Sequence, residues 1–253
     1  MGRDVLVLCY HAISEQWPAA LSSTPEQFEA HLSVLSRRGY RGVTFHEAVR
    51  EPVAKRAVAI TFDDGYRSVL ELARPVLEHY NMPATVFVPT ALVGIERPMS
   101  WDGIDHWLGS EHESELVPMS WDDLGELASA GWEIGSHTRT HPRLTLLDDR
   151  GVRNELEGSR RDCERALGLP CRSLAYPFGD HDERVVRFAE RAGFSAGGAL
   201  PKGFPRSPNA LAYPRVGVYH RDNSARFRLK ASALVRRLRA NPAWSALGPA
   251  RSP

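Results

Sequence analysis

Two adjacent carboxylates, Asp63 and Asp64, end an apolar run that begins at Ala57, and a glycine follows them. Like charges placed side by side repel each other, and burial adds a desolvation cost to both. Asp-Asp-Gly is ordinary turn chemistry, so a solvated turn is one interpretation. A bound cation is the other, because one carboxylate can ligate the cation while the second stays ionised in its positive field.

Two histidines with a metal-ligand spacing follow a second apolar run. His137 and His141 stand four residues apart after the run from Trp132 to Ser136, and residues i and i+4 share one face of a helical turn. Two surface histidines flanking a turn would show the same spacing. With one aspartate, however, two imidazoles favour Zn²⁺ or a neighbouring transition metal over Ca²⁺ or Mg²⁺. The other aspartate is then free to take a proton from water activated by the metal.

Two more chemical groups follow predicted strands. The tight turn from Tyr176 to Gly179 can present a backbone N–H to an acyl oxygen. His11 follows the first strand on the same face as Val7 and Cys9, because side chains alternate with period two. A core histidine bonded to backbone is the plain interpretation of His11, and a proton donor to a leaving amine is the chemical one. Together these groups indicate metal-assisted hydrolysis of an amide or ester.

Strands alternating with helices must position these groups. Short apolar runs alternate with helix-period segments along the chain, which predicts an α/β fold with a parallel sheet, and seven or eight such units predict a single (β/α)7-type barrel. The C-terminal ends of the strands of such a barrel open on one face, so all of these groups are expected at one mouth. The candidate strands are Val5 to Tyr10, Arg41 to Phe45, Ala57 to Phe62, Ala84 to Pro89, Trp132 to Ser136, Ser173 to Tyr176, Phe194 to Leu200 and Ala212 to Tyr219.

No linker divides the chain into two halves. We expect one barrel over residues 1–220 and a basic C-terminal helix and tail over residues 221–253, which packs on the barrel or extends from it. Contact of this tail with a membrane surface is the minor alternative. A polar, acidic insertion from about Val93 to Pro118 is too long for an ordinary loop between a strand and a helix. We expect this insertion to act as a lid that limits the length of the substrate.

Composition excludes several classes of protein. The 253 residues are 42% hydrophobic and 25% charged, as in a soluble globular enzyme, and the net charge of +1 gives no general attraction to nucleic acid. Three cysteines without a CxxC spacing predict core or surface thiols rather than a disulfide framework. No signal peptide and no bilayer-spanning run is visible, so a cytoplasmic protein is expected. The sequence carries no signal for the oligomeric state.

Three motifs resemble those of one enzyme family. TFDDG at Thr61 to Gly65, HTRTH at His137 to His141 and YPFG at Tyr176 to Gly179 match, in order and spacing, the first three motifs of the polysaccharide deacetylases, carbohydrate esterase family 4. The resemblance covers the chain from Leu8 to about Tyr219. The early YH, the strand ending FVPT and the helix around STPEQF are similar to the circularly permuted branch, which includes poly-N-acetylglucosamine deacetylases.

The resemblance implies a metal-dependent hydrolase that removes N-acetyl groups from an N-acetylated sugar, a glycan or a glycan precursor. It implies a distorted (β/α)7 barrel with a divalent metal at the C-terminal ends of its strands, Zn²⁺ foremost and Co²⁺, Ni²⁺ or Fe²⁺ as alternatives. The implied catalytic groups are Asp63 as base, His11 as general acid and the backbone N–H of Phe178 as oxyanion donor, with His220 as the acid if the ordinary arrangement applies. The implied metal ligands are Asp64, His137 and His141.

One position departs from the family pattern. Ala175 stands where many members have an arginine that orients the base, and Arg215 or, less conveniently, Arg172 is expected to supply that charge. The expected substrate contacts near the mouth are Tyr66, Trp101, Tyr176, Pro177, Phe178 and Arg215. Trp101 could equally be a residue packed on the barrel. Two alternatives stay open: the same chemistry on a cyclic imide, ureide or natural-product acetamide, and a barrel that binds glycan without catalysis.

Overall fold

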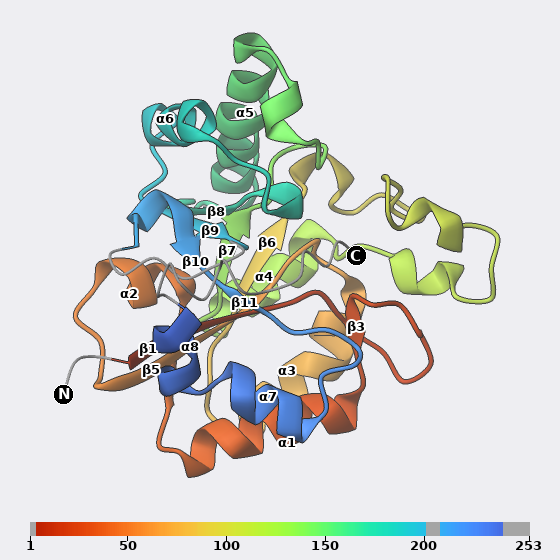
Figure 1. Ribbon diagram of the computed structural model, residues 1–253. Helices are drawn as coiled ribbons and strands as arrows, with labels where there is room; N and C mark the ends of the chain where they lie inside the picture. The colour runs from red at the N-terminus through yellow and green to blue at the C-terminus, as the bar shows by residue number, and fades with distance from the viewer. Residues whose placement is uncertain (1–3, 201–207, 240–253) are drawn as a thin grey trace.

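The computed structural model describes residues 4–200 and 208–239, and its centre is a parallel sheet that curls into a nearly closed barrel (Figure 1). The sheet order is β10-β9-β8-β7-β6-β5-β1-β11. These strands are β1 (Asp4–Tyr10), β5 (Arg56–Phe62), β6 (Thr85–Val88), β7 (Glu133–Ser136), β8 (Ser173–Ala175), β9 (Ala196–Ala199), β10 (Tyr213–Pro214) and β11 (Val216–Gly217). Of the shorter strands, β4 (Arg41–Val43) pairs with the start of β5, and β2 (Ala12–Ile13) pairs with β3 (Ser22–Ser23). The predicted (β/α)7-type barrel is confirmed.

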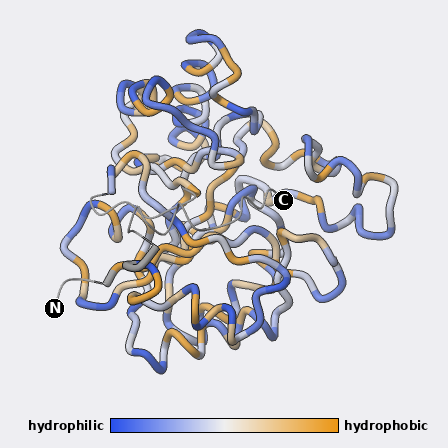
Figure 2. Tube along the Cα trace, in the orientation of Figure 1, coloured by the Kyte–Doolittle hydropathy of each residue, from blue (hydrophilic) through white to orange (hydrophobic). Residues whose placement is uncertain are grey.

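Helices follow most of the strands and lie around the barrel (Figure 1). They are α1 (Pro25–Arg37), α2 (Phe45–Arg50), α3 (Arg74–His79), α4 (Trp121–Ser129), α5 (Asp149–Leu167), α6 (Glu183–Arg191), α7 (Ser224–Lys230) and α8 (Ala233–Arg239). Figure 2 shows apolar residues concentrated in the central strands and polar residues on the outer turns of the helices. This distribution is the one that the sequence periodicity predicts.

Residues 213–217 close the barrel. In this segment β10 pairs with β9, whereas β11 pairs with β1 at the opposite end of the sheet. The single strand predicted from Ala212 to Tyr219 is therefore wrong, because the chain leaves one edge of the sheet and joins the other at Arg215. The Arg215 side chain is buried, with a relative exposure of 2%.

The predicted strand from Arg41 to Phe45 also ends early, at Val43. The Thr44 side chain accepts a hydrogen bond from the Glu47 N–H, and the Glu47 carboxylate accepts one from the Thr44 N–H. This capping box starts α2 at Phe45. The Phe45 ring then packs edge-on against Phe87 in the smaller of the two apolar clusters, with 5.4 Å between the ring centroids.

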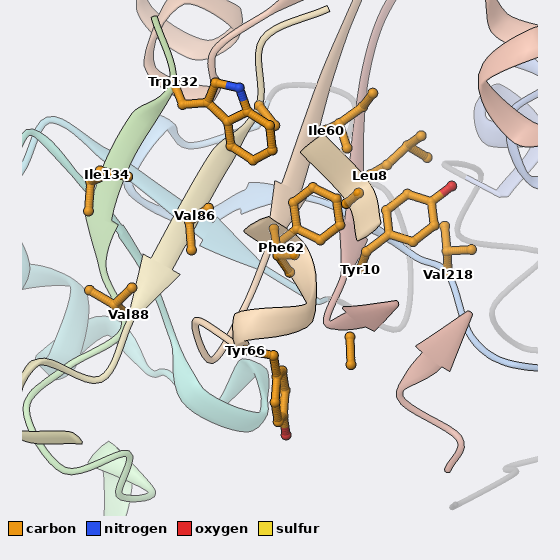
Figure 3. Packing of buried hydrophobic residues seen from close by; sticks show 14 of the residues in the cluster. Leu8, Tyr10, Ile60, Phe62, Tyr66, Val86, Val88, Trp132, Ile134 and Val218 are labelled. Atoms are coloured by element: carbon orange, nitrogen blue, oxygen red, sulfur yellow. The ribbon is translucent and has the colours of Figure 1, made fainter. Parts of the chain in front are cut away.

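The barrel strands bury side chains on both of their faces. Large residues such as Leu8, Phe62 and Val86 belong to the main core (Figure 3). A second cluster holds mostly smaller residues from alternate positions of the same strands, among them Val7, Ala59, Phe87, Ala175 and Ala196. Val7 lies in this second cluster and Cys9 is fully buried, in keeping with the period-two prediction for the first strand.

The insertion at residues 93–118 is a folded lobe beside the barrel (Figure 1). The Met99 N–H donates to the Leu116 carbonyl at 2.9 Å, which ties the two arms of the lobe together. Trp107 packs edge-on against Trp17, which follows the first barrel strand. The lobe is thus fixed to the rim of the barrel, and its role as a lid stays a prediction.

Of the C-terminal helices, α7 packs beside α1. His31 of α1 stacks on Phe227 of α7 with 3.9 Å between the ring centroids, and Lys230 pairs with Asp222. The division at residue 220 stays a prediction, and residues 240–253 of the predicted tail lie outside the described residues. Within the described ranges, no helix is both long enough and apolar enough to cross a membrane.

Candidate active site

Asp64, His137 and His141 come together at the C-terminal ends of β5 and β7. Asp64 Oδ1 lies 3.4 Å from His137 Nε2 and 3.3 Å from His141 Nε2. One ligand atom from each residue lies within 4.8 Å of the others. Asp64 Oδ1 is buried and has no hydrogen-bond partner among the described residues, which is a costly state unless a cation or proton satisfies it. These residues therefore fit a divalent metal.

Backbone geometry and one hydrogen bond orient these side chains. Asp64 and His141 have left-handed φ angles of 70° and 62°, and Thr138 between the histidines has a φ of 67°. Such angles are strained for residues other than glycine. His137 Nδ1 lies 2.9 Å from the Ala175 carbonyl, to which it can only donate. That bond fixes the tautomer that leaves Nε2 free to ligate.

Asp63 is held by a different partner. Arg215 Nη1 and Nη2 donate to its two carboxylate oxygens, each at 2.7 Å, so the ion pair is bidentate. Burial raises the pKa of Asp63, but the charges of Arg215 and His137 outweigh burial and lower the pKa to about 2. Asp63 is therefore ionised at neutral pH. The arginine expected beside the base is Arg215, whereas Arg172 is exposed at the surface.

A glycine on β9, Gly198, makes room for Arg215. Ala175 belongs to the second apolar cluster and pairs with Gly198 on the next strand. A Cβ added at Gly198 would lie 2.7 Å from Arg215 Nε. The guanidinium thus occupies space that a side chain at Gly198 would fill.

His11 and Cys9 lie next to Asp63. One ligand atom each of Cys9, His11 and Asp63 lies within 4.8 Å of the others. Burial lowers the pKa of His11, and the charges of Asp64 and Asp63 oppose that shift. Burial raises the pKa of the Cys9 thiol, which stays protonated and donates to Asp63 Oδ2 at 3.4 Å. The contact between Cys9 and Asp63 was not predicted from the sequence.

His220, the alternative acid, lies elsewhere. Its ring Nδ1 is 3.2 Å from Ser22 Oγ, and its backbone N–H donates to the Ala20 carbonyl at 3.0 Å. These contacts tie His220 to the segment that follows the first barrel strand. Of the two histidines, His11 is the one that lies beside Asp63.

The aromatic residues expected at the mouth divide into two groups. The Tyr66 and Tyr176 rings are buried, Tyr66 against Trp17 and Tyr176 stacked on His181. Stacking of either ring on a sugar is therefore a wrong prediction, because protein covers both faces. Pro177 is buried as well.

Trp101 and Phe178 do lie beside His141, one of the candidate metal ligands. Their ring centroids are 4.2 Å and 4.8 Å from that of His141. Phe178 is 39% exposed, and the Arg143 guanidinium lies 4.2 Å from its ring centroid. Phe178 also has a left-handed φ of 59° within the turn Pro177–Gly179. These two rings can present apolar faces to a substrate at the mouth.

The sequence model of the polysaccharide deacetylase family matches residues 50–197, which include the two adjacent aspartates. This protein therefore belongs to that family. The predicted family, and with it the deacetylase class of hydrolase, is thereby confirmed. YxkH of Bacillus subtilis (strain 168), named as a polysaccharide deacetylase, is 29% identical over 219 residues, which are 84% of this chain and 70% of the relative. A poly-beta-1,6-N-acetyl-D-glucosamine N-deacetylase of Staphylococcus aureus (strain MSSA476) is 24% identical over 77% of this chain and 67% of its own.

Solved structures share the barrel. IcaB from Ammonifex degensii is 26% identical with a TM-score of 0.72, and the match covers 92% of this chain and 99% of that one. The Streptococcus pyogenes deacetylase PplD, in complex with acetate, has a TM-score of 0.77 at 22% identity, over 92% of this chain and all of its own. At that identity the likeness to PplD shows the fold alone. The family match itself contains Asp63 and Asp64 but neither His11 nor Arg215.

Proposed function

We propose that this protein is a divalent-metal-dependent N-deacetylase that hydrolyses the acetamide of an N-acetylated sugar or glycan. The observation that carries the proposal is the unequal setting of the two adjacent aspartates. Asp64 faces two imidazole nitrogens, whereas Asp63 is ionised and held by Arg215. One carboxylate is thus available as a ligand and the other as a base. Zn²⁺ is the proposed metal, because two imidazoles, one carboxylate and open positions suit it, and Co²⁺, Ni²⁺ and Fe²⁺ are alternatives.

Asp63 and the residues that would hold the metal share the activation of the attacking water. Asp64, His137 and His141 would hold the metal, which when bound supplies a Lewis acid that polarises the acetamide carbonyl and lowers the pKa of water. Asp63 accepts a proton from the water that attacks the acetyl carbon. The bidentate bond to Arg215 keeps the carboxylate ionised and fixed in direction for that transfer.

Two groups complete the reaction. The backbone N–H of Phe178 stabilises the negative charge that develops on the carbonyl oxygen. As the C–N bond breaks, protonated His11 gives its proton to the leaving nitrogen. Burial lowers the pKa of His11, and the charges of Asp64 and Asp63 oppose that shift. The products are acetate and a free amine. Trp101 and Phe178 offer flat apolar faces to the sugar ring beside the acetamide.

Acetate release from β-1,6-linked N-acetylglucosamine oligomers tests the substrate class. These oligomers are the first choice because a relative bears the name of that activity. The Zn²⁺-loaded protein should release acetate from them at least about tenfold faster than it opens a cyclic imide of comparable concentration, since only a sugar uses both aromatic faces. Faster turnover of the imide, with no acetate from any oligomer, would shift the function to a small-molecule amidohydrolase.

A further inference from the structure

Side chains on one face of α5 form hydrogen bonds with the loop that joins His137 to His141. We propose that Glu155 is a positioning residue, which holds this loop in its metal-binding geometry before any metal arrives. The inference rests on the proposed metal site and adds a residue that touches neither metal nor substrate.

Glu155 is buried beneath the loop, with a relative exposure of 6%. Its Oε2 accepts hydrogen bonds from the backbone N–H groups of Arg139 at 2.7 Å and Thr140 at 2.9 Å. Its Oε1 accepts from the Thr140 hydroxyl at 2.8 Å. Both N–H groups belong to residues between the two histidines. A carboxylate that accepts several such bonds is a strong anchor, because charge-assisted hydrogen bonds exceed neutral ones in strength.

Other residues on the same face of α5 hold the same loop. Ser159 Oγ lies 2.7 Å from Ser136 Oγ, which in turn accepts from the Thr138 N–H at 3.0 Å. Asp162 accepts from Arg139 Nε at 3.1 Å. Positions 155, 159 and 162 are four and three residues apart, so they line one face of the helix.

A glycine lets the loop approach this face closely. A Cβ added at Gly158 would lie 2.4 Å from Arg139 Cδ. The Arg139 side chain therefore lies across α5 at the point where the helix lacks a side chain. Together with Glu155, Gly158 fixes how near the loop can lie to the helix.

The loop needs such an anchor because its backbone is strained. Thr138 and His141 both have left-handed φ angles, each of which costs about 1–2 kcal/mol for a residue with a Cβ. The two imidazole nitrogens must also converge on Asp64 within 3.4 Å. Without Glu155, the loop could relax to an unstrained form, and metal binding would have to reverse that relaxation.

The test compares Glu155→Gln with Glu157→Gln. Glu157 lies on the same helix but pairs only at the surface, with Arg153 and Arg161. Zn²⁺ affinity is measured on metal-free folded protein by competition with a chromophoric chelator, and the Tm of each metal-free protein is recorded. We expect Glu155→Gln to raise the Kd for Zn²⁺ by about tenfold or more, the range seen for residues that support metal ligands. Glu157→Gln should stay within about twofold of the parent.

A second variant tests the inference even if Glu155→Gln does not fold. Thr140→Val removes one of the three hydrogen bonds to Glu155 and leaves the carboxylate in place, and it should raise the Kd less than Glu155→Gln but in the same direction. A lower Tm for Glu155→Gln with an unchanged Kd would overturn the inference, since a residue that only stabilises the fold gives that result. If the parent protein binds no Zn²⁺, the proposed function fails together with this inference. Binding by the parent and equally by the variant overturns this inference alone.

Discussion

Asp63→Asn should slow acetate release by about a thousandfold or more while the Kd for Zn²⁺ changes only a few-fold. Asparagine has nearly the shape of aspartate but accepts no proton at neutral pH, so the attacking water loses its base. The metal ligands are untouched, because Asp64, not Asp63, faces the two imidazoles. The kinetic constant to follow is kcat/KM on N-acetylglucosamine oligomers.

The neighbouring variant Asp64→Asn is the matched control for this prediction. It removes the same charge one residue away, yet it should weaken Zn²⁺ binding strongly, because it replaces the only carboxylate in the ligand set. The two variants therefore separate base from ligand. If Asp63→Asn retained more than about a tenth of the parent rate, the base would lie elsewhere, and His11 would become the first alternative.

Arg215→Met should damage both stability and the pH profile. The arginine is buried and bonds both oxygens of Asp63, so its removal leaves a buried carboxylate without a countercharge. Breaking one side of such a pair costs about 3–5 kcal/mol of unfolding free energy. Urea denaturation of both proteins at pH 7 measures this difference.

The pH dependence of the same variant follows from the pKa of Asp63. In the parent protein Arg215 helps to lower this pKa from 3.8 to about 2, so the pair stabilises the fold above pH 3.8 and loses that stabilisation as the pH falls through about 2. Without Arg215, less opposes the effect of burial, so the pKa of Asp63 rises. The acid limb of kcat/KM should therefore move to higher pH, because catalysis needs ionised Asp63.

Arg172→Met serves as the control for Arg215. Arg172 is exposed, and its substitution should change stability by less than about 0.5 kcal/mol. Equal effects of the two substitutions, or an acid limb that does not move in Arg215→Met, would mean that Arg215 does not set the charge state of the base.

The sequence alone predicts the barrel and the convergence of Asp63, Asp64, His137 and His141. Hydrophobic periodicity identifies strands, and the residues after parallel strands meet at one mouth. The break of the last strand at Arg215 was not visible, because closing a barrel joins two sheet edges that are far apart in sequence. The predicted strand from Arg41 to Phe45 was too long for a local reason. The capping box at Thr44 starts a helix at Phe45, although the apolar run favours a strand.

The sequence also did not predict how the side chains at the mouth of the barrel are oriented. Tyr66 and Trp101 are both aromatic and near the site. Tyr66 is fully buried and has no free ring face, and this burial depends on the whole fold rather than on the local sequence. Glu155 did carry a signal that could have been used. It lies between Val152 and Leu156 on the apolar side of α5, and a charged residue on a buried helix face requires a partner.

Metal removal and restoration test the central claim most directly. Acetate release from N-acetylglucosamine oligomers is measured for protein stripped with a chelator, and again after addition of one equivalent of Zn²⁺ or Co²⁺. The account predicts release close to background from the stripped protein and recovery of most of the activity with one equivalent. Full activity in the stripped protein would contradict it, because Asp64, His137 and His141 would then have no metal to hold.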